Sequence, residues 1–222
     1  GVQTCALPIC PIRVHDGGQY FQQADGAPFF WLGDTAWLLP QKLNREEVKT
    51  YFENRRAKGF NVVQLCVVQF LTDKNIYGSP ALIGENITKL NVTPGADPAD
   101  PAQYDYWDHV DHVLTTAAAN GIYVAIAPVW SHMVRRTPLT AAQVGPYIEQ
   151  VARRYQSHPN IIWLNGGSGR GHENADVWQV IGETLRRHNP QQLVSYHPFG
   201  RTVTSEWFKD AAWLSFHQIG RA

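Results

Sequence analysis

The run FNVVQLCVVQ, residues 60–69, is apolar at almost every position and directly follows Gly59. A strand with one face in water would alternate apolar and polar side chains, and this run does not alternate. Its length suits a strand better than a helix, and its valines favour extended backbone. We therefore expect a strand that is buried on both faces, as in a parallel sheet that is covered by helices.

Short apolar runs of the same kind recur on both sides of this one. Amphipathic stretches with helical spacing separate them. The runs span residues 28–33, 60–69, 122–130, 160–164, 193–196 and 213–216. This alternation predicts about six consecutive strand–helix units, and so a (β/α)8 TIM barrel that is truncated after about six β/α units.

The N-terminal region adds two further signals. Asp16-Gly17-Gly18 and Asp25-Gly26 are typical of turns, and they predict a short β-hairpin ahead of the barrel. An open doubly wound sheet is the alternative to a barrel, but such sheets usually carry a glycine-rich phosphate loop after the first strand. The segment Leu32-Gly33-Asp34-Thr35 is no such loop, so the barrel is favoured.

Helix signals lie between the apolar runs. Asn44, with Glu47 three residues later, is typical of a capping box, and Gly59 can end the helix that it starts. We expect further helices within residues 104–120, 144–155, 177–185 and 205–209. Because the helix at 104–120 should cover the outside of the barrel, His109 and His112 are expected on a solvated face.

The composition excludes some classes of partner. Lys+Arg and Asp+Glu both number 19, so the formal net charge is zero and no bulk field attracts nucleic acid or an anionic membrane. No apolar run approaches the roughly 18 residues of a membrane span. Aromatic residues make up 12% of the chain, and aromatic rings stack on sugars as well as filling cores. The composition permits a carbohydrate enzyme without requiring one.

Both ends of the chain resemble translated sequencing-library adapters. These are GVQTCALPI at residues 1–9 and IGRA at residues 219–222. We therefore expect a non-native tail over residues 1–11, a partial catalytic barrel domain over 12–218 and an adapter-like end over 219–222. Cys5 and Cys10 fall in the tail, whereas Cys66 should be a small buried hydrophobe. Such a sequence would lack any signal peptide, so the cellular location stays open.

Polar and aromatic residues follow the expected strands throughout. In a (β/α)8 barrel the chemistry lies at the C-terminal ends of the strands, where the loops converge. Any single residue there could be a capped or hydrogen-bonded loop residue, but their common position predicts one binding rim. The residues are Asp34, Trp37, Gln64, Gln69, Trp130, Ser131, His132, Asn165, Gly166, Gly167, Ser168, His197, His217 and Gln218.

A metal-dependent hydrolase is an alternative for such a barrel. Four histidines fall near the expected strand ends, namely His132, His172, His197 and His217. The first strand, however, lacks a His-x-His pair, and no carboxylate completes a metal shell. We therefore expect no metal and no other cofactor.

Several separated motifs resemble those of the apiosidase-like glycoside hydrolases, glycoside hydrolase family 140 and its relatives. They occur in the same order and cover about residues 28–218. They are FWLGDTAW (30–37), NIIWLNGG (160–167), VW (177–178), YHPFGR (196–201), SEWF (205–208) and WLSF (213–216). The resemblance implies a retaining barrel with two catalytic carboxylates, acting on plant cell-wall polysaccharide such as apiose-bearing pectin. It also implies a bacterial protein of the periplasm or the exterior.

The resemblance places a serine where the family has its acid/base. In the family that residue is the Asp after the Gly-Gly of the fourth strand, and here the position is Ser168. The family's second carboxylate lies on a later strand, beyond residue 222. A hydroxyl cannot usefully protonate a leaving oxygen, so we predict that the chain does not cleave sugars. Glu173 could replace the acid if its loop folds back.

The remaining rim residues are predicted to bind substrate. The resemblance makes Asp34 a ligand of a sugar hydroxyl. We expect Trp37 and Trp130 to stack on sugar or to pack the rim, and the other members to hydrogen-bond hydroxyls: Gln64, Asn165, His197 and His217. The predicted function is an apiosidase-like glycoside hydrolase of oligo- or polysaccharide, and a catalytically dead carbohydrate-binding homologue is the alternative.

Overall fold

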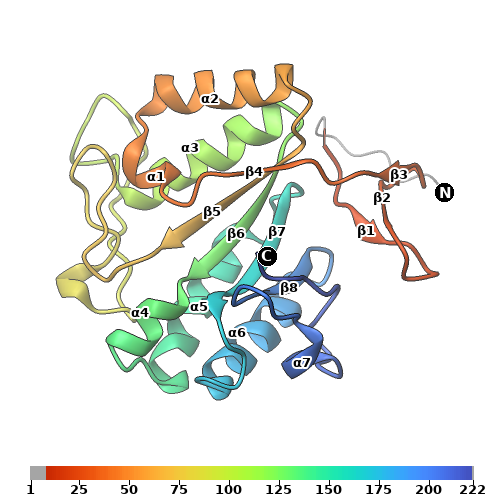
Figure 1. Cartoon of the computed structure of the whole chain (residues 1–222). Helices are drawn as coiled ribbons and strands as arrows, with labels where there is room; N and C mark the ends of the chain where they lie inside the picture. The colour runs from red at the N-terminus through yellow and green to blue at the C-terminus, as the bar shows by residue number, and fades with distance from the viewer. Residues whose placement is uncertain (1–8, 222) are drawn as a thin grey trace.

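The structure is a computed structural model that describes residues 9–221. Its centre is a curled sheet of five parallel strands, with helices packed on the outer face (Figure 1). The strands are β4 (Gly33–Thr35), β5 (Val62–Val68), β6 (Tyr123–Val129), β7 (Ile161–Gly169) and β8 (Leu193–Pro198). Most of the expected tail lies outside the described residues.

The order of the strands decides between the two candidate folds. Along the sheet it is β4-β5-β6-β7-β8, the same as along the chain, and every neighbouring pair is parallel. A doubly wound sheet reverses its strand order at a switch point, and this sheet has no reversal. The sheet therefore follows the strand order of a barrel and forms about half of one, as expected from the alternating runs.

Helices connect the strands on the outside of the sheet. The capping box predicted for Asn44 is present, since its side chain accepts from the Glu47 N–H and the Glu47 carboxylate accepts from the Asn44 N–H. The helices are α1 (Leu39–Lys42), α2 (Arg45–Ala57), α3 (Tyr106–Ala119), α4 (Ser131–Arg136), α5 (Ala141–Tyr155), α6 (Ala175–His188) and α7 (Ser205–Phe208), with a 3-10 turn at Ile83–Glu85. In the described part of the chain, no helix has the length and apolar character needed to cross a membrane.

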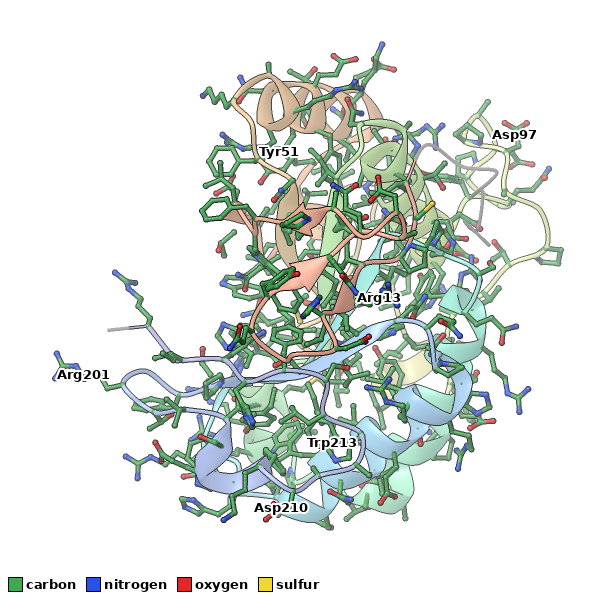
Figure 2. All side chains as sticks on the ribbon, turned by 90° about the vertical axis from the view of Figure 1, so that its right-hand side faces the viewer. Arg13, Tyr51, Asp97, Arg201, Asp210 and Trp213 are labelled. Carbon is green, nitrogen blue, oxygen red and sulfur yellow. The ribbon has the colours of Figure 1, made fainter. Side chains whose placement is uncertain are left out.

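The N-terminal hairpin is larger than predicted. It is a three-stranded antiparallel sheet of β1 (Arg13–Val14), β2 (Phe21–Gln22) and β3 (Pro28–Phe29), with Arg13 near the middle of the view in Figure 2. The expected first barrel strand at 28–33 is therefore wrong, because its first half pairs with β2 instead. The Asn61 side chain then redirects the chain, accepting from the Leu32 N–H at 2.8 Å and donating to the Phe30 carbonyl at 2.6 Å.

The expected sixth strand at 213–216 does not form. The segment does lie beside β8, because the Ser215 N–H donates to the Val194 carbonyl at 2.7 Å. Side chains take the place of the remaining ladder bonds: the Val194 N–H donates to Ser215 Oγ, and Ser195 Oγ donates to the Phe216 carbonyl. Arg186 on α6 fixes the segment from outside by donating to the Trp213 carbonyl at 2.9 Å.

The two faces of the sheet have different neighbours. Inward residues such as Cys66 and Ile162 pack with each other and with the small sheet, whereas outward residues such as Leu65 and Trp163 pack against the helices. Cys66 is fully buried, as expected, and burial raises the pKa of its thiol.

The prediction of a solvated face for His109 was wrong. Its side chain is fully buried, and the two ring nitrogens contact the Leu43 carbonyl at 2.9 Å and the Tyr104 hydroxyl at 3.0 Å. Burial lowers its pKa to about 4. The reason is that α1 and the long connection of residues 70–104 cover this part of α3, whereas a minimal barrel would leave it in water.

Candidate active site

A cavity of about 1120 Å³ opens on the inward face of the half-barrel. The strands supply one part of its wall, and the small N-terminal sheet and the segment 215–221 supply the rest. The lining residues are Val14, Gly18, Gln19, Tyr20, Phe21, Trp31, Thr35, Trp37, Gln64, Ser168, His197, Ser215, Phe216, His217, Gln218, Ile219 and Arg221. Six residues that the sequence predicts for the rim are among them: Trp37, Gln64, Ser168, His197, His217 and Gln218.

Three rings gather at the strand ends. The Trp37 ring lies edge-on to Trp130 with 4.6 Å between centroids, and edge-on to His197 with 5.3 Å. The centroids of Trp130 and His197 are 5.7 Å apart. Trp130 thus supports two lining residues from behind. The apolar faces and polar edges of such rings suit the C–H and O–H groups of a sugar.

The fourth barrel strand ends in an irregular stretch of backbone. Gly166, Gly167 and Ser168 all have positive φ, at 90°, 106° and 57°, and the pairing of β7 with β8 shifts register between Gly166 and Gly169. A Cβ at Gly166 would lie 2.5 Å from the Tyr196 ring, and one at Gly167 would lie 2.7 Å from the Trp130 ring. Both glycines are therefore required by close packing as well as by backbone conformation.

This bulge brings Ser168 to the cavity wall beside His197. The Ser168 N–H donates to Nδ1 of His197 at 3.1 Å. Nδ1 must be unprotonated to accept this bond, and burial lowers the pKa of His197, which favours the same neutral ring.

Asp34 and Asn165 do not line the cavity, so their predicted place at the mouth is corrected. Oδ2 of Asp34 lies 2.7 Å from Nε of Arg55 and accepts from the Tyr51 hydroxyl at 2.9 Å, both on α2 (Figure 2 labels Tyr51). Asn165 is fully buried and donates from Nδ2 to the Trp178 carbonyl of α6 at 2.7 Å. Successive side chains of a strand point to opposite faces, and both residues fall on the outward face.

Glu173 does not reach the cavity either. Its carboxylate lies 3.5 Å from Nη1 of Arg135 on α4, and its own backbone carbonyl accepts from the Trp178 indole. Among residues 9–221, no Asp or Glu lines the cavity. The place predicted for the acid is therefore occupied by a serine, with no carboxylate beside it.

The four histidines of the metal alternative do not converge. His132 packs on Phe70 and His172 on Trp207, whereas His197 and His217 line the cavity. Within the described residues there is no group of three or more His, Cys, Asp or Glu side chains that could hold a metal ion. Among residues 9–221, the metal-dependent alternative therefore has no ligand set.

Several lining residues are not predicted by the sequence patterns. Thr35, one residue after Asp34, points inward, and the alternation of side chains along a strand could have identified it had the phase been known. Phe21 comes from β2, Tyr20 from the turn before it, and Trp31 from the connection between β3 and β4. Phe216 packs edge-on to Phe21 with 4.9 Å between centroids. No local pattern predicts that these segments meet.

Comparison with known proteins gives a consistent result. The family model described as "Apiosidase-like, catalytic domain" matches residues 15–220. A crystal structure of a glycoside hydrolase family 5 protein from Bacteroides vulgatus ATCC 8482 is similar, with 34% identity and a TM-score of 0.85 over 94% of this chain and 44% of that one. A second structure, described as a glycoside hydrolase, has 34% identity and a TM-score of 0.86 over 94% of this chain and 45% of that one.

More distant structures share the fold alone. The endo-1,4-beta-mannanase from Rhizomucor miehei has 17% identity and a TM-score of 0.63, over 84% of this chain and 60% of that one. Among curated proteins, no sequence matches this chain. The chain spans less than half the length of the two structures that are 34% identical to it. On the match over residues 15–220, the chain belongs to the family of apiosidase-like catalytic domains.

Proposed function

We propose that this chain is the sugar-binding part of an apiosidase-like glycoside hydrolase, and that it binds carbohydrate without cleaving it. The observation that carries the proposal is the composition of the cavity wall. Trp37, His197 and Ser168 line the cavity, Trp130 packs on both rings, and no carboxylate of the described residues lines it. The substrate class that we propose is plant cell-wall polysaccharide with apiose-bearing side chains.

The chemistry of glycoside hydrolysis supports the negative half of the proposal. Retaining hydrolysis needs two carboxyl groups about 5–5.5 Å apart, one as acid/base and one as nucleophile. General acid catalysis alone contributes roughly 10²–10⁴-fold. Ser168 supplies neither group, and Asp34 and Glu173 are held by Arg55 and Arg135 away from the cavity.

The direct test measures binding and cleavage in parallel. Oligosaccharides from apiose-bearing pectin are titrated into the chain by calorimetry, and the same samples are followed for release of reducing ends. We expect binding that is weakened by Trp37→Ala, with no release above the uncatalysed rate. No binding by the unmodified chain, or cleavage by it, would sink the proposal.

A second experiment separates an enzyme lineage from a binding homologue. Both variants are made in a form of the protein that also carries the later strands, because the resemblance places the family's second carboxyl group beyond residue 222. There Ser168→Asp restores the carboxyl group that the family resemblance expects, and Ser168→Ala is the matched control. Cleavage gained by Ser168→Asp alone would identify position 168 as an acid/base position. If both variants bind sugar and neither cleaves it, the chain is better described as a carbohydrate-binding homologue.

A further inference from the structure

We propose that His197 is a positioning residue that holds residue 168 at the cavity wall, while the opposite edge of the same ring offers a hydrogen-bond donor to the sugar. The proposal rests on the proposed function for its ligand, but the positioning half concerns contacts within the chain alone. It assigns His197 a second role, beside the binding of a hydroxyl that the sequence predicts.

The backbone at residue 168 needs such a restraint. Ser168 has a φ of 57°, in the left-handed region that side chains other than glycine rarely adopt. It follows two glycines with positive φ, so the chain would otherwise have many alternatives here. Whichever conformation residue 168 adopts decides whether its side chain faces the cavity.

Three hydrogen bonds restrain this bulge, and one of them acts at residue 168 itself. Ser131 Oγ donates to the Gly167 carbonyl at 2.5 Å, and the Phe199 N–H donates to the Gly169 carbonyl at 3.0 Å. Between them, the Ser168 N–H donates to Nδ1 of His197 at 3.1 Å. The outer two bonds fix the ends of the bulge, so the His197 bond selects the conformation in the middle.

The His197 ring is itself well oriented. Trp37 lies edge-on to it, with 5.3 Å between centroids and an interplanar angle of 87°, and Trp130 packs at 5.7 Å. With Nδ1 accepting from Ser168, the neutral ring carries its proton on Nε2. His197 lines the cavity, so this Nε2–H is the donor that we assign to a sugar hydroxyl.

Two substitutions separate the two ring nitrogens. In His197→Asn the side-chain oxygen can take the place of Nδ1, and in His197→Gln the amide NH2 can take the place of Nε2–H. Hydrogen exchange of the Ser168 amide reports the positioning role without any ligand. We expect exchange about tenfold faster in His197→Ala and His197→Gln, and close to the unmodified rate in His197→Asn.

Sugar binding reports the second role. With the pectic oligosaccharides used above, His197→Asn should bind at least about fivefold more weakly although its Ser168 amide stays protected. His132→Asn is the matched control, since His132 packs on Phe70 and should change neither readout. Exchange of the Val124 amide, which donates to the Asn160 carbonyl inside the core, checks that each variant is folded.

Clear outcomes would overturn the proposal. If the Ser168 amide exchanges as fast in His197→Asn as in His197→Ala, the ring does not position residue 168 through Nδ1. A ring that nitrogen-15 NMR shows to be protonated on Nδ1 would contradict it equally. If no form of the chain binds sugar, the proposed function fails and so does the ligand half of this inference, but the amide result still decides the positioning half.

Discussion

The inward and outward faces of the half-barrel are built from neighbouring residues of the same strands, yet the inward residues line the cavity and the outward residues contact the helices. On β4, Thr35 lines the cavity, whereas Asp34 binds Arg55 and Tyr51 of α2. On β8, at the opposite edge of the sheet, His197 faces the cavity and its neighbour Tyr196 packs into the helix layer. Position at a strand end brings a residue to the rim, but the alternation of side chains decides whether it can meet a ligand. The outward face should therefore govern stability and the inward face binding.

The strongest test of this division is Trp163→Ala. Trp163 is fully buried on the outward face, and its indole N–H donates to Oε1 of Gln192 at 2.5 Å. Removing the ring leaves a large cavity and an unpaired amide, so we expect a loss of about 3–5 kcal/mol in the free energy of unfolding. Urea unfolding followed by circular dichroism measures it. A loss below about 1 kcal/mol would show that the helix layer is loosely packed.

The second test uses pH to weaken the outer layer at His109. Burial lowers the pKa of His109 to about 4, against about 6.5 for an unfolded histidine. The unfolded chain therefore binds this proton first, so the stability is complete above pH 6.5 and falls as the pH drops from 6.5 to 4, by about 3 kcal/mol.

Unfolding curves between pH 4 and 7 check this slope, with His109→Gln as the comparison. Glutamine cannot be protonated, so the variant should lose most of the slope in that range. What slope remains would come from other histidines whose pKa values burial also lowers, among them His112, His158 and, on the inward face, His197. An unchanged slope in His109→Gln would place the acid sensitivity elsewhere.

The alternation of side chains along a strand also explains which parts of the fold and the site the sequence could predict. The runs at 60–69 and 122–130 correctly predicted β5 and β6, and Asn44 with Glu47 predicted the start of α2. A strand that is apolar on both faces, however, carries no period-two pattern, so its phase cannot be read from the sequence. For this reason the sequence predicts Asp34 and Asn165 at the rim, whereas both point to the helices.

Other differences come from contacts between distant segments. The small sheet takes Pro28 and Phe29 from the expected first strand because they pair with β2. Ser215 caps Val194 with its side chain, so the expected sixth strand lies in place without a ladder. These pairings depend on which segments lie next to each other in the fold, and the spacing of residues along the chain does not show that.

The third test repeats the tryptophan-to-alanine change on the inward face. Trp37 lines the cavity and contacts Trp130 and His197. We expect Trp37→Ala to weaken the affinity for pectic oligosaccharides about tenfold, ~1.4 kcal/mol, because one ring face for stacking is lost. Its effect on unfolding should be smaller than that of Trp163→Ala. If the larger loss were in stability and the affinity stayed unchanged, Trp37 would be a packing residue of the rim.

The smallest effect is expected for Asp34→Asn, and it sharpens the comparison most. The ion pair with Arg55 is partly exposed, with 29% of the Asp34 side chain and 25% of the Arg55 side chain accessible, so we expect a loss of at most about 1 kcal/mol in unfolding free energy. The pKa of Tyr51, raised to about 12 by burial and by its bond to Asp34, should fall towards its ordinary value, as an ultraviolet titration would show. Sugar affinity should not change.

Thr35→Ala is the matched control one residue away, and it should lower the affinity with little effect on stability, because Thr35 lines the cavity. Should Asp34→Asn weaken binding as much as Thr35→Ala does, the carboxylate acts on the ligand after all, and the division between the two faces would not hold at β4.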